Sequence, residues 1–254
     1  MFAKRKKERV LPEPQQVGEV LTMVMGKVSK GLKSLNGETA KYWSGHADDK
    51  KLHGAINALC QILLRQNLVT EAINPQLADW LQFYREVFDL EWDPADINLP
   101  AERFGFGWLV VVAKGLTRNA VFGLCYKRFN GKVWRFYDDL NKAVTHNDRE
   151  PIETYAIRVR DCVEADECHK GKSANTATGA GIKGMTNLER MLLELWYHWK
   201  TNDHLDKKNL TICSGSRYAD GFVPYARWYG GKFYVCYVLP DHAFDDWRVR
   251  ETVS

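Results

Sequence analysis

The spacing of apolar residues predicts helices in the N-terminal part of the chain. Residues 17–32, residues 47–67 and the stretch after Asn74 carry apolar side chains every three or four positions, the repeat of an amphipathic helix. The third stretch also carries a start signal, because Asn74 is a good N-cap and Pro75 suits the first helical position. A helical region over residues 15–92 is therefore expected.

Beyond residue 100 the pattern changes to short runs of β-branched and aromatic residues, which are typical of strands. The runs cover residues 104–113, 120–129, 132–137, 154–163, 210–213, 222–228 and 232–238. The pairs Asn130-Gly131 and Gly230-Gly231 stand between consecutive runs and predict two hairpin turns. An antiparallel sheet is the expected result.

One further helix is expected among these strands. Thr186 and Glu189 match a capping box, and an apolar stripe runs from Leu188 to Trp199. Residues 169–183 are rich in glycine, alanine and threonine and are predicted to form a mobile loop. The whole pattern predicts an α+β fold with a basic tail over residues 1–14, a helical region over residues 15–92 and an antiparallel α+β domain over residues 101–254.

The composition is that of a globular protein, with 45% hydrophobic and 27% charged residues in 254. The longest apolar run covers the seven residues 233–239, whereas a membrane-spanning helix needs roughly 18 or more. The six cysteines are scattered, and no apolar segment follows the basic start. These features predict a cytoplasmic chain with reduced thiols and no membrane contact.

Positive charge is concentrated near the N-terminus. Residues 1–41 hold nine basic and four acidic side chains, a net charge of +5, while the other 213 residues come to −1. Such asymmetry favours an anionic partner, although a short basic start can also be solvated without one.

Two clusters near the end of the run 154–163 have the side chains of a metal site. Cys162, Cys168 and His169 offer the thiolates and imidazole that zinc prefers, but five residues separate the cysteines where two to four are usual. The alternative is a buried thiol beside a surface histidine. Beyond these clusters, no cofactor is predicted.

Acidic residues at the same place allow a different chemistry. Asp161, Glu164 and Asp166 are able to hold magnesium for phosphodiester hydrolysis, with Lys170 placed to stabilise the developing charge. Acids at strand ends are, however, often just solvated. Catalytic residues therefore remain candidates in a metal-dependent nuclease or other hydrolase.

Aromatic and basic residues alternate along the predicted strands. Lys132, Trp134 and Phe136 should share one face, while Arg135 lies on the other. A sheet face with aromatics and cations stacks single-stranded bases and neutralises their phosphates. The alternative is that these rings fill the core, with cations on the wet face.

The sequence thus predicts a non-enzymatic nucleic-acid-binding or assembly protein, whose partner is single-stranded nucleic acid or another anion. A metal-dependent hydrolase and a protein-interaction module are the alternatives. The predicted nucleic-acid-binding residues are Lys4, Arg5, Lys6, Lys7, Arg9, Lys27, Lys30, Lys33, Trp134, Arg135, Arg217 and Arg227.

Overall fold

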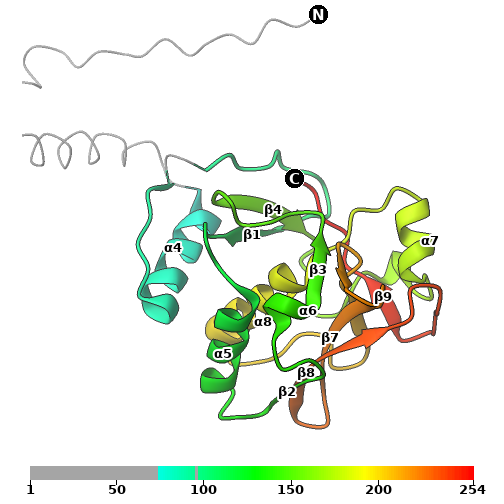
Figure 1. The fold of residues 1–254 in the computed structure, drawn as a ribbon. Coiled ribbons are helices and arrows are strands. Elements are labelled where there is room, and N and C mark those ends of the chain that lie inside the picture. The colour runs from blue at the N-terminus through cyan, green and yellow to red at the C-terminus, as the bar shows by residue number, and fades with distance from the viewer. Residues whose placement is uncertain (1–73, 95–96) are drawn as a thin grey trace, which may run out of the picture. The chain divides into compact units, whose positions relative to one another are not determined.

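The computed structural model describes residues 74–94 and 97–254 (Figure 1). The basic tail and the helices predicted over residues 17–32 and 47–67 lie outside these residues. Within the described part, the predicted α+β class is confirmed by helices packed on several sheets. Residues 72–254 form one compact unit, which includes the helix that begins at Pro75.

The described elements alternate along the chain without a repeat. The helices are α4 (Pro75–Phe88), α5 (Arg118–Arg128), α6 (Leu140–Ala143), α7 (Ala174–Gly179) and α8 (Asn187–Thr201), with a 3-10 turn at Glu167–His169. The strands are β1 (Trp108–Val112), β2 (Val133–Arg135), β3 (Val144–Asn147), β4 (Tyr155–Val159), β5 (Leu210–Ile212), β6 (Ser216–Tyr218), β7 (Val223–Tyr229), β8 (Lys232–Val238) and β9 (Trp247–Val249). Among these elements, no helix is long and apolar enough to span a bilayer.

Helix α4 begins where the sequence predicts, because the Asn74 side chain accepts hydrogen bonds from the backbone N–H groups of the first turn. Its buried face docks on β1. Trp80 Nε1 donates to the carbonyl oxygen of Leu109 at 2.7 Å, and Tyr84 Oη donates to that of Val111 at 2.8 Å. Two aromatic side chains thereby satisfy their polar atoms while burying their rings.

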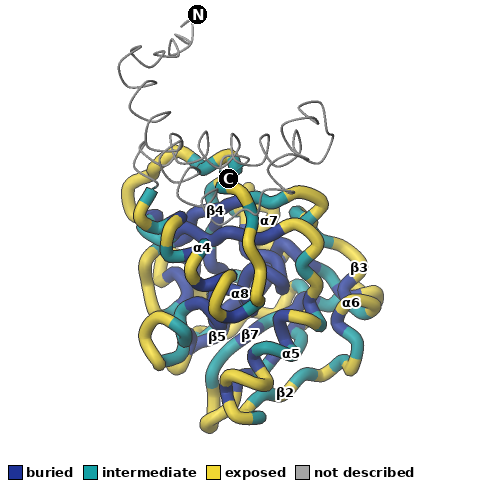
Figure 2. Tube along the Cα trace, turned by 90° about the vertical axis from the view of Figure 1, so that its left-hand side faces the viewer, coloured by how far each residue is buried: buried dark blue, intermediate teal, exposed yellow. Residues whose placement is uncertain are grey.

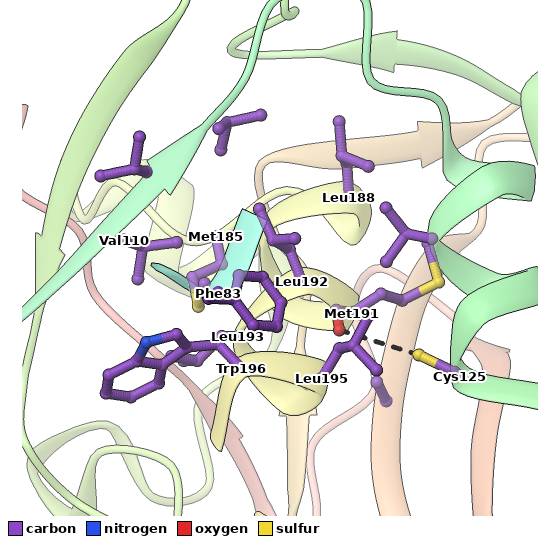
Figure 3. Close-up of a cluster of buried hydrophobic side chains, with 14 of the residues drawn as sticks. Phe83, Val110, Cys125, Met185, Leu188, Met191, Leu192, Leu193, Leu195 and Trp196 are labelled. Carbon is purple, nitrogen blue, oxygen red and sulfur yellow. Dashed lines mark hydrogen bonds between the residues drawn. The ribbon is translucent and has the colours of Figure 1, made fainter. Parts of the chain in front are cut away.

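Helix α8 is the centre of the unit. Thr186 caps it and forms the predicted capping box with Glu189. Residues 187–196 are all buried, whereas the last turns of the helix reach the surface. Figure 3 shows the apolar side chains around this helix, among them Phe83, Val110, Cys125, Leu188, Met191, Leu192 and Leu195. Figure 2 shows the buried positions gathered in the interior of the described part, with the exposed positions on its outer loops and turns.

The largest sheet has five strands in the order β2-β8-β7-β5-β9. Strands β7 and β8 form the predicted hairpin, and both residues of the turn, Gly230 and Gly231, have positive φ. The sheet is mixed, because β2 runs parallel to β8 and β5 runs parallel to β9. The pairs β1-β4 and β3-β6 are antiparallel.

The two faces of this sheet have different coverings. Ala226, Phe233 and Val235 point into the main core with α5 and α8. On the opposite face, residues of β5, β7, β8 and β9 pack against Ala174 and Ala177 of α7. Helix α7 covers only that end, and the part of this face on β2, β8 and β7 holds residues that are exposed or half-buried.

Three predictions of local structure are wrong: the strand over residues 120–129, the hairpin turn at Asn130-Gly131 and the loop over residues 169–183. Residues 120–129 form helix α5 with its C-cap, not a strand, because Val121, Phe122 and Cys125 are buried on one helical face. The pair Asn130-Gly131 therefore links a helix to β2; both residues still have the positive φ that the hairpin signal implies. Residues 169–183 are not a plain loop, since they contain α7.

Candidate functional site

The open part of the sheet carries a regular grid of aromatic and basic side chains, here called the aromatic platform. It is defined by alternate residues of β2, β8 and β7, together with the residues that flank β2. They are Lys132, Trp134, Phe136, Lys232, Tyr234, Cys236, Tyr225, Arg227 and Tyr229.

The strand register places these side chains in rows across the sheet. Trp134 pairs with Tyr234, and Tyr234 pairs with Arg227. In the next row Cys236 pairs with Tyr225, and the backbone N–H of Phe136 continues the β2-β8 ladder at 3.0 Å. Paired residues on one face stand roughly 5 Å apart, which brings neighbouring rings into contact.

The aromatic rings of the platform are close to one another and are partly exposed to solvent. The ring centroids of Trp134 and Tyr234 are 5.7 Å apart, and those of Trp134 and Phe136 are 6.3 Å apart. Trp134 is 41% exposed, Phe136 47% and Tyr229 61%. Large apolar side chains are thus gathered on one accessible surface, while Ala226, Phe233 and Val235 on the other face of β7 and β8 are buried.

The charge of the platform is positive. Its three ionisable cations are Lys132, Lys232 and Arg227, and none of its nine residues is acidic. Both lysines are exposed, whereas the Arg227 side chain is 16% exposed and lies over the Tyr229 ring at 4.6 Å. Arg227 also pairs with Asp246, outside the platform, at 3.3 Å.

The structure divides the predicted nucleic-acid-binding residues. Trp134 and Arg227 lie on the platform. Arg135 is on the other face of β2, where it stacks over Phe122 at 4.8 Å. Arg217 donates to the carbonyl oxygens of residues 214 and 216, and burial lowers its pKa. The predicted basic residues at positions 4–33 lie outside the described residues.

Tyr229, Lys232 and Tyr234 are platform residues that the predicted set lacks. The signal that finds them is the Gly230-Gly231 turn. A two-residue hairpin fixes the register of its strands, and here it sets Tyr229 opposite Lys232. The shared face then follows from the alternation of each strand.

A second cluster lies at the 3-10 turn Glu167–His169. Asp166, Cys168 and His169 each present one potential ligand atom, and these atoms lie within 4.8 Å of one another. Asp166 and His169 are buried, whereas Cys168 is exposed. The Asp166 carboxylate pairs with Arg160 and accepts the backbone N–H of Glu251 at 2.8 Å.

The other predicted catalytic and metal-binding residues do not join this group. Asp161 is exposed and lies against the backbone of residue 107. Glu164 accepts the backbone N–H groups of residues 208 and 209, which fixes a loop. Lys170 is exposed, and Cys162 lines a cavity of about 570 Å³ with Glu164 and others. A three-carboxylate magnesium site is therefore not assembled by these residues.

A third group of charges lies inside the fold. Arg190, Glu194, Asp206 and Arg250 are fully buried. Asp206 accepts hydrogen bonds from both arginines, and Arg190 also donates to Glu194 at 2.9 Å. Burial by itself would raise the pKa of Asp206, but the two guanidinium groups outweigh it and hold the pKa below its usual value. These charges are paired with one another, and the four residues have no exposed surface for a ligand.

No protein-family model, curated protein or solved structure matches this chain.

Proposed function

We propose that the chain binds single-stranded nucleic acid on the aromatic platform, as a non-enzymatic binding or assembly protein. The observation that carries the proposal is the row of Trp134, Tyr234 and Arg227 in register across three strands of an open sheet face. Such a row combines flat rings with a cation at the spacing of neighbouring strands.

Base stacking supplies the first part of the interaction. Unpaired bases stack on exposed aromatic rings whatever their sequence, and each stacked base contributes about 1–3 kcal/mol. Trp134, Phe136 and Tyr229 have exposed surface for such contacts. A double helix has no free base faces and a curved rigid surface, so the flat platform favours single strands.

Phosphate neutralisation supplies the second part. Lys132 and Lys232 are exposed at one end of the platform, and Arg227 lies among its rings. Binding of a polyanion by these cations releases counterions, so affinity falls as salt rises. The basic residues at positions 4–9 are proposed to add nonspecific attraction to the same phosphates.

The charge also argues against a second copy of the chain as the occupant. Two platforms placed face to face would bring the cations of one copy against those of the other, which costs free energy. A nucleic acid brings the complementary charge.

The five described cysteines are free thiols, in keeping with a cytoplasmic location.

The test is fluorescence anisotropy of the full chain with labelled single strands of ~16 nucleotides, DNA and RNA, at low salt. Trp134→Ala should weaken binding about fivefold or more, because about 1 kcal/mol of stacking is lost. The matched control is Phe104→Ala, since Phe104 is fully exposed and lies outside the platform. Equal binding by wild type and Trp134→Ala would remove the platform from the interaction.

Salt dependence separates the platform from the tail. Lys232→Ala should lower the slope of log affinity against log salt by about 0.7, the value for one phosphate contact on a single strand. Deleting residues 1–9 should also weaken binding and flatten this slope. If only the deletion has an effect, the tail binds without the platform; if the free chain dimerises through Trp134, the platform is an oligomer interface.

A further inference from the structure

We infer that Asp166, Cys168 and His169 form a binding site for one thiophilic divalent cation of the zinc class. The three ligands come from four consecutive residues at the 3-10 turn Glu167–His169. None of them belongs to the aromatic platform, so the site stands apart from the proposed nucleic-acid surface.

The donor atoms lie near enough to one another to share one cation. Their mutual separations are within 4.8 Å. Zinc bonds of about 2.0–2.3 Å place tetrahedral ligands roughly 3.3–3.6 Å apart, so donors at the 4.8 Å limit would have to move together by about 1.2–1.5 Å. Cys168 is exposed, and rotation of its side chain can supply this movement without disturbing the core.

An orphaned buried atom points independently to a ligand. Asp166 is only 1% exposed, and among the described residues its Oδ1 atom has no hydrogen-bond partner. Its other oxygen is held by Arg160 and by the backbone N–H of Glu251. A buried carboxylate oxygen without a partner costs free energy, and a bound cation removes that cost.

The surroundings of His169 prepare one ring nitrogen as a ligand. Nε2 lies 3.1 Å from a Glu251 carboxylate oxygen, and Nδ1 lies 3.1 Å from Lys172 Nζ. A carboxylate only accepts and an ammonium only donates, so in the neutral ring these two contacts favour the proton on Nε2 and the lone pair on Nδ1. Metal-binding histidines almost always donate their other N–H in this way, often to a carboxylate.

Lys172 does not block the site permanently. Its ammonium also donates to the Cys168 carbonyl oxygen at 3.2 Å, a contact that remains when a cation takes the Nδ1 lone pair. Arg160 bridges Asp166 and Glu251 and so holds both carboxylates in place. The positive charge of these neighbours disfavours hard cations, whereas a cysteine thiolate gives zinc-class ions a strong bond.

The coordination set leaves one position for water or an added ligand. Three protein ligands and an open fourth position are typical of reactive zinc sites. Cys168 is exposed while Asp166 and His169 are buried, so the site is reached from solvent at Cys168.

The test is cobalt titration of the full chain, first freed of metal by a chelator. One Co²⁺ per chain should bind with the near-ultraviolet charge-transfer band of a cobalt–thiolate bond, and Zn²⁺ should abolish this band by displacement. Excess Mg²⁺ should leave it unchanged. The band needs neither nucleic acid nor enzymatic activity, so its result is independent of the proposed function.

Cys168→Ser should remove the band and weaken Zn²⁺ binding roughly tenfold or more. The matched control is Cys162→Ser, since Cys162 is the other exposed free cysteine among the described residues and should keep the band. Asp166→Asn tests the buried ligand, and unchanged tryptophan fluorescence checks that each variant folds. A folded wild type without the band, or a band that survives Cys168→Ser, would overturn the inference.

Discussion

Replacing the buried carboxylate of Asp206 by an amide should destabilise the protein strongly. In the folded chain Asp206 accepts hydrogen bonds from Arg190 at 2.8 and 3.0 Å, from Arg250 at 3.1 Å and from the Thr211 hydroxyl. Asp206→Asn keeps the size of the side chain. It also suits the backbone, because Asp206 has a φ of 52° and asparagine tolerates this left-handed region well. The change therefore isolates the charge.

The magnitude follows from the charges left behind. Arg190 and Arg250 have no exposed surface, and in the variant Glu194 is the remaining carboxylate of the group. Removing one partner from such a buried group costs about 3–5 kcal/mol. A domain is stable by about 5–15 kcal/mol, so the loss is a large fraction of the total.

Urea denaturation followed by tryptophan fluorescence measures this loss. Eight of the nine tryptophans lie in residues 72–254, so the signal reports on this compact unit. With a slope of about 2 kcal/mol per molar urea, the midpoint should fall by about 1.5–2.5 M. Asp245→Asn removes the same charge at an exposed position and should shift the midpoint by less than about 0.3 M. An equal, small shift in both variants would refute the reasoning.

The pH dependence gives a second check on the same substitution. The folded-state pKa of Asp206 is lowered, so on acidification the unfolded chain takes up this proton first. The ionised Asp206 carboxylate contributes its full stabilisation above the ordinary aspartate pKa of about 3.9. This stabilisation is lost as pH falls towards the lower pKa that Asp206 has in the folded chain. The stability gap between wild type and Asp206→Asn should therefore be constant near neutral pH and narrow only below about pH 4.

Three further predictions concern packing and exposure. Thr186→Ala should lower the free energy of unfolding by about 1 kcal/mol, because the α8 capping bond is lost, and Thr186→Ser should restore most of it. Gly215→Ala should lower the free energy of unfolding by about 1–3 kcal/mol in urea denaturation, since the added methyl would lie 2.8 Å from a backbone carbonyl oxygen. The control Gly179→Ala has open space around the added methyl and should not show this loss. Maleimide should label Cys162 in the native protein but Cys125 only after unfolding, because burial removes access to the Cys125 thiol and raises its pKa. Labelling is measured by mass spectrometry. Labelling of Cys125 in the native protein would contradict the packing of α5 on α8.

Local signals in the sequence were sufficient for the two helices with distinct caps. Asn74 with Pro75, and Thr186 with Glu189, satisfy the first N–H groups of α4 and α8 through side chains within a few residues. The β7-β8 hairpin was equally local, because two glycines supply the positive φ that its turn needs. Interactions between residues this close in sequence are predictable without knowledge of the fold.

Helix α5 was not predictable from local sequence signals. Its residues have strand propensity and follow no strong apolar repeat, so the local preference is for a strand. Burial of Val121 and Cys125 in the common core outweighs that preference. Propensity differences are a few tenths of a kcal/mol per residue, whereas burying an apolar side chain contributes about 1.5–3 kcal/mol.

The candidate sites show the same division. Alternation within one strand set Trp134 apart from Arg135, but only the sheet decided which of the two faces solvent. Asp166, Cys168 and His169 are neighbours in sequence, so their proximity was open to prediction. Glu251 reaches His169 across 82 residues, and no local pattern encodes that contact. Local residue patterns indicate which side chains are able to take part in a site. Long-range packing selects which of them meet, because burial and pairing energies arise only when distant segments come together.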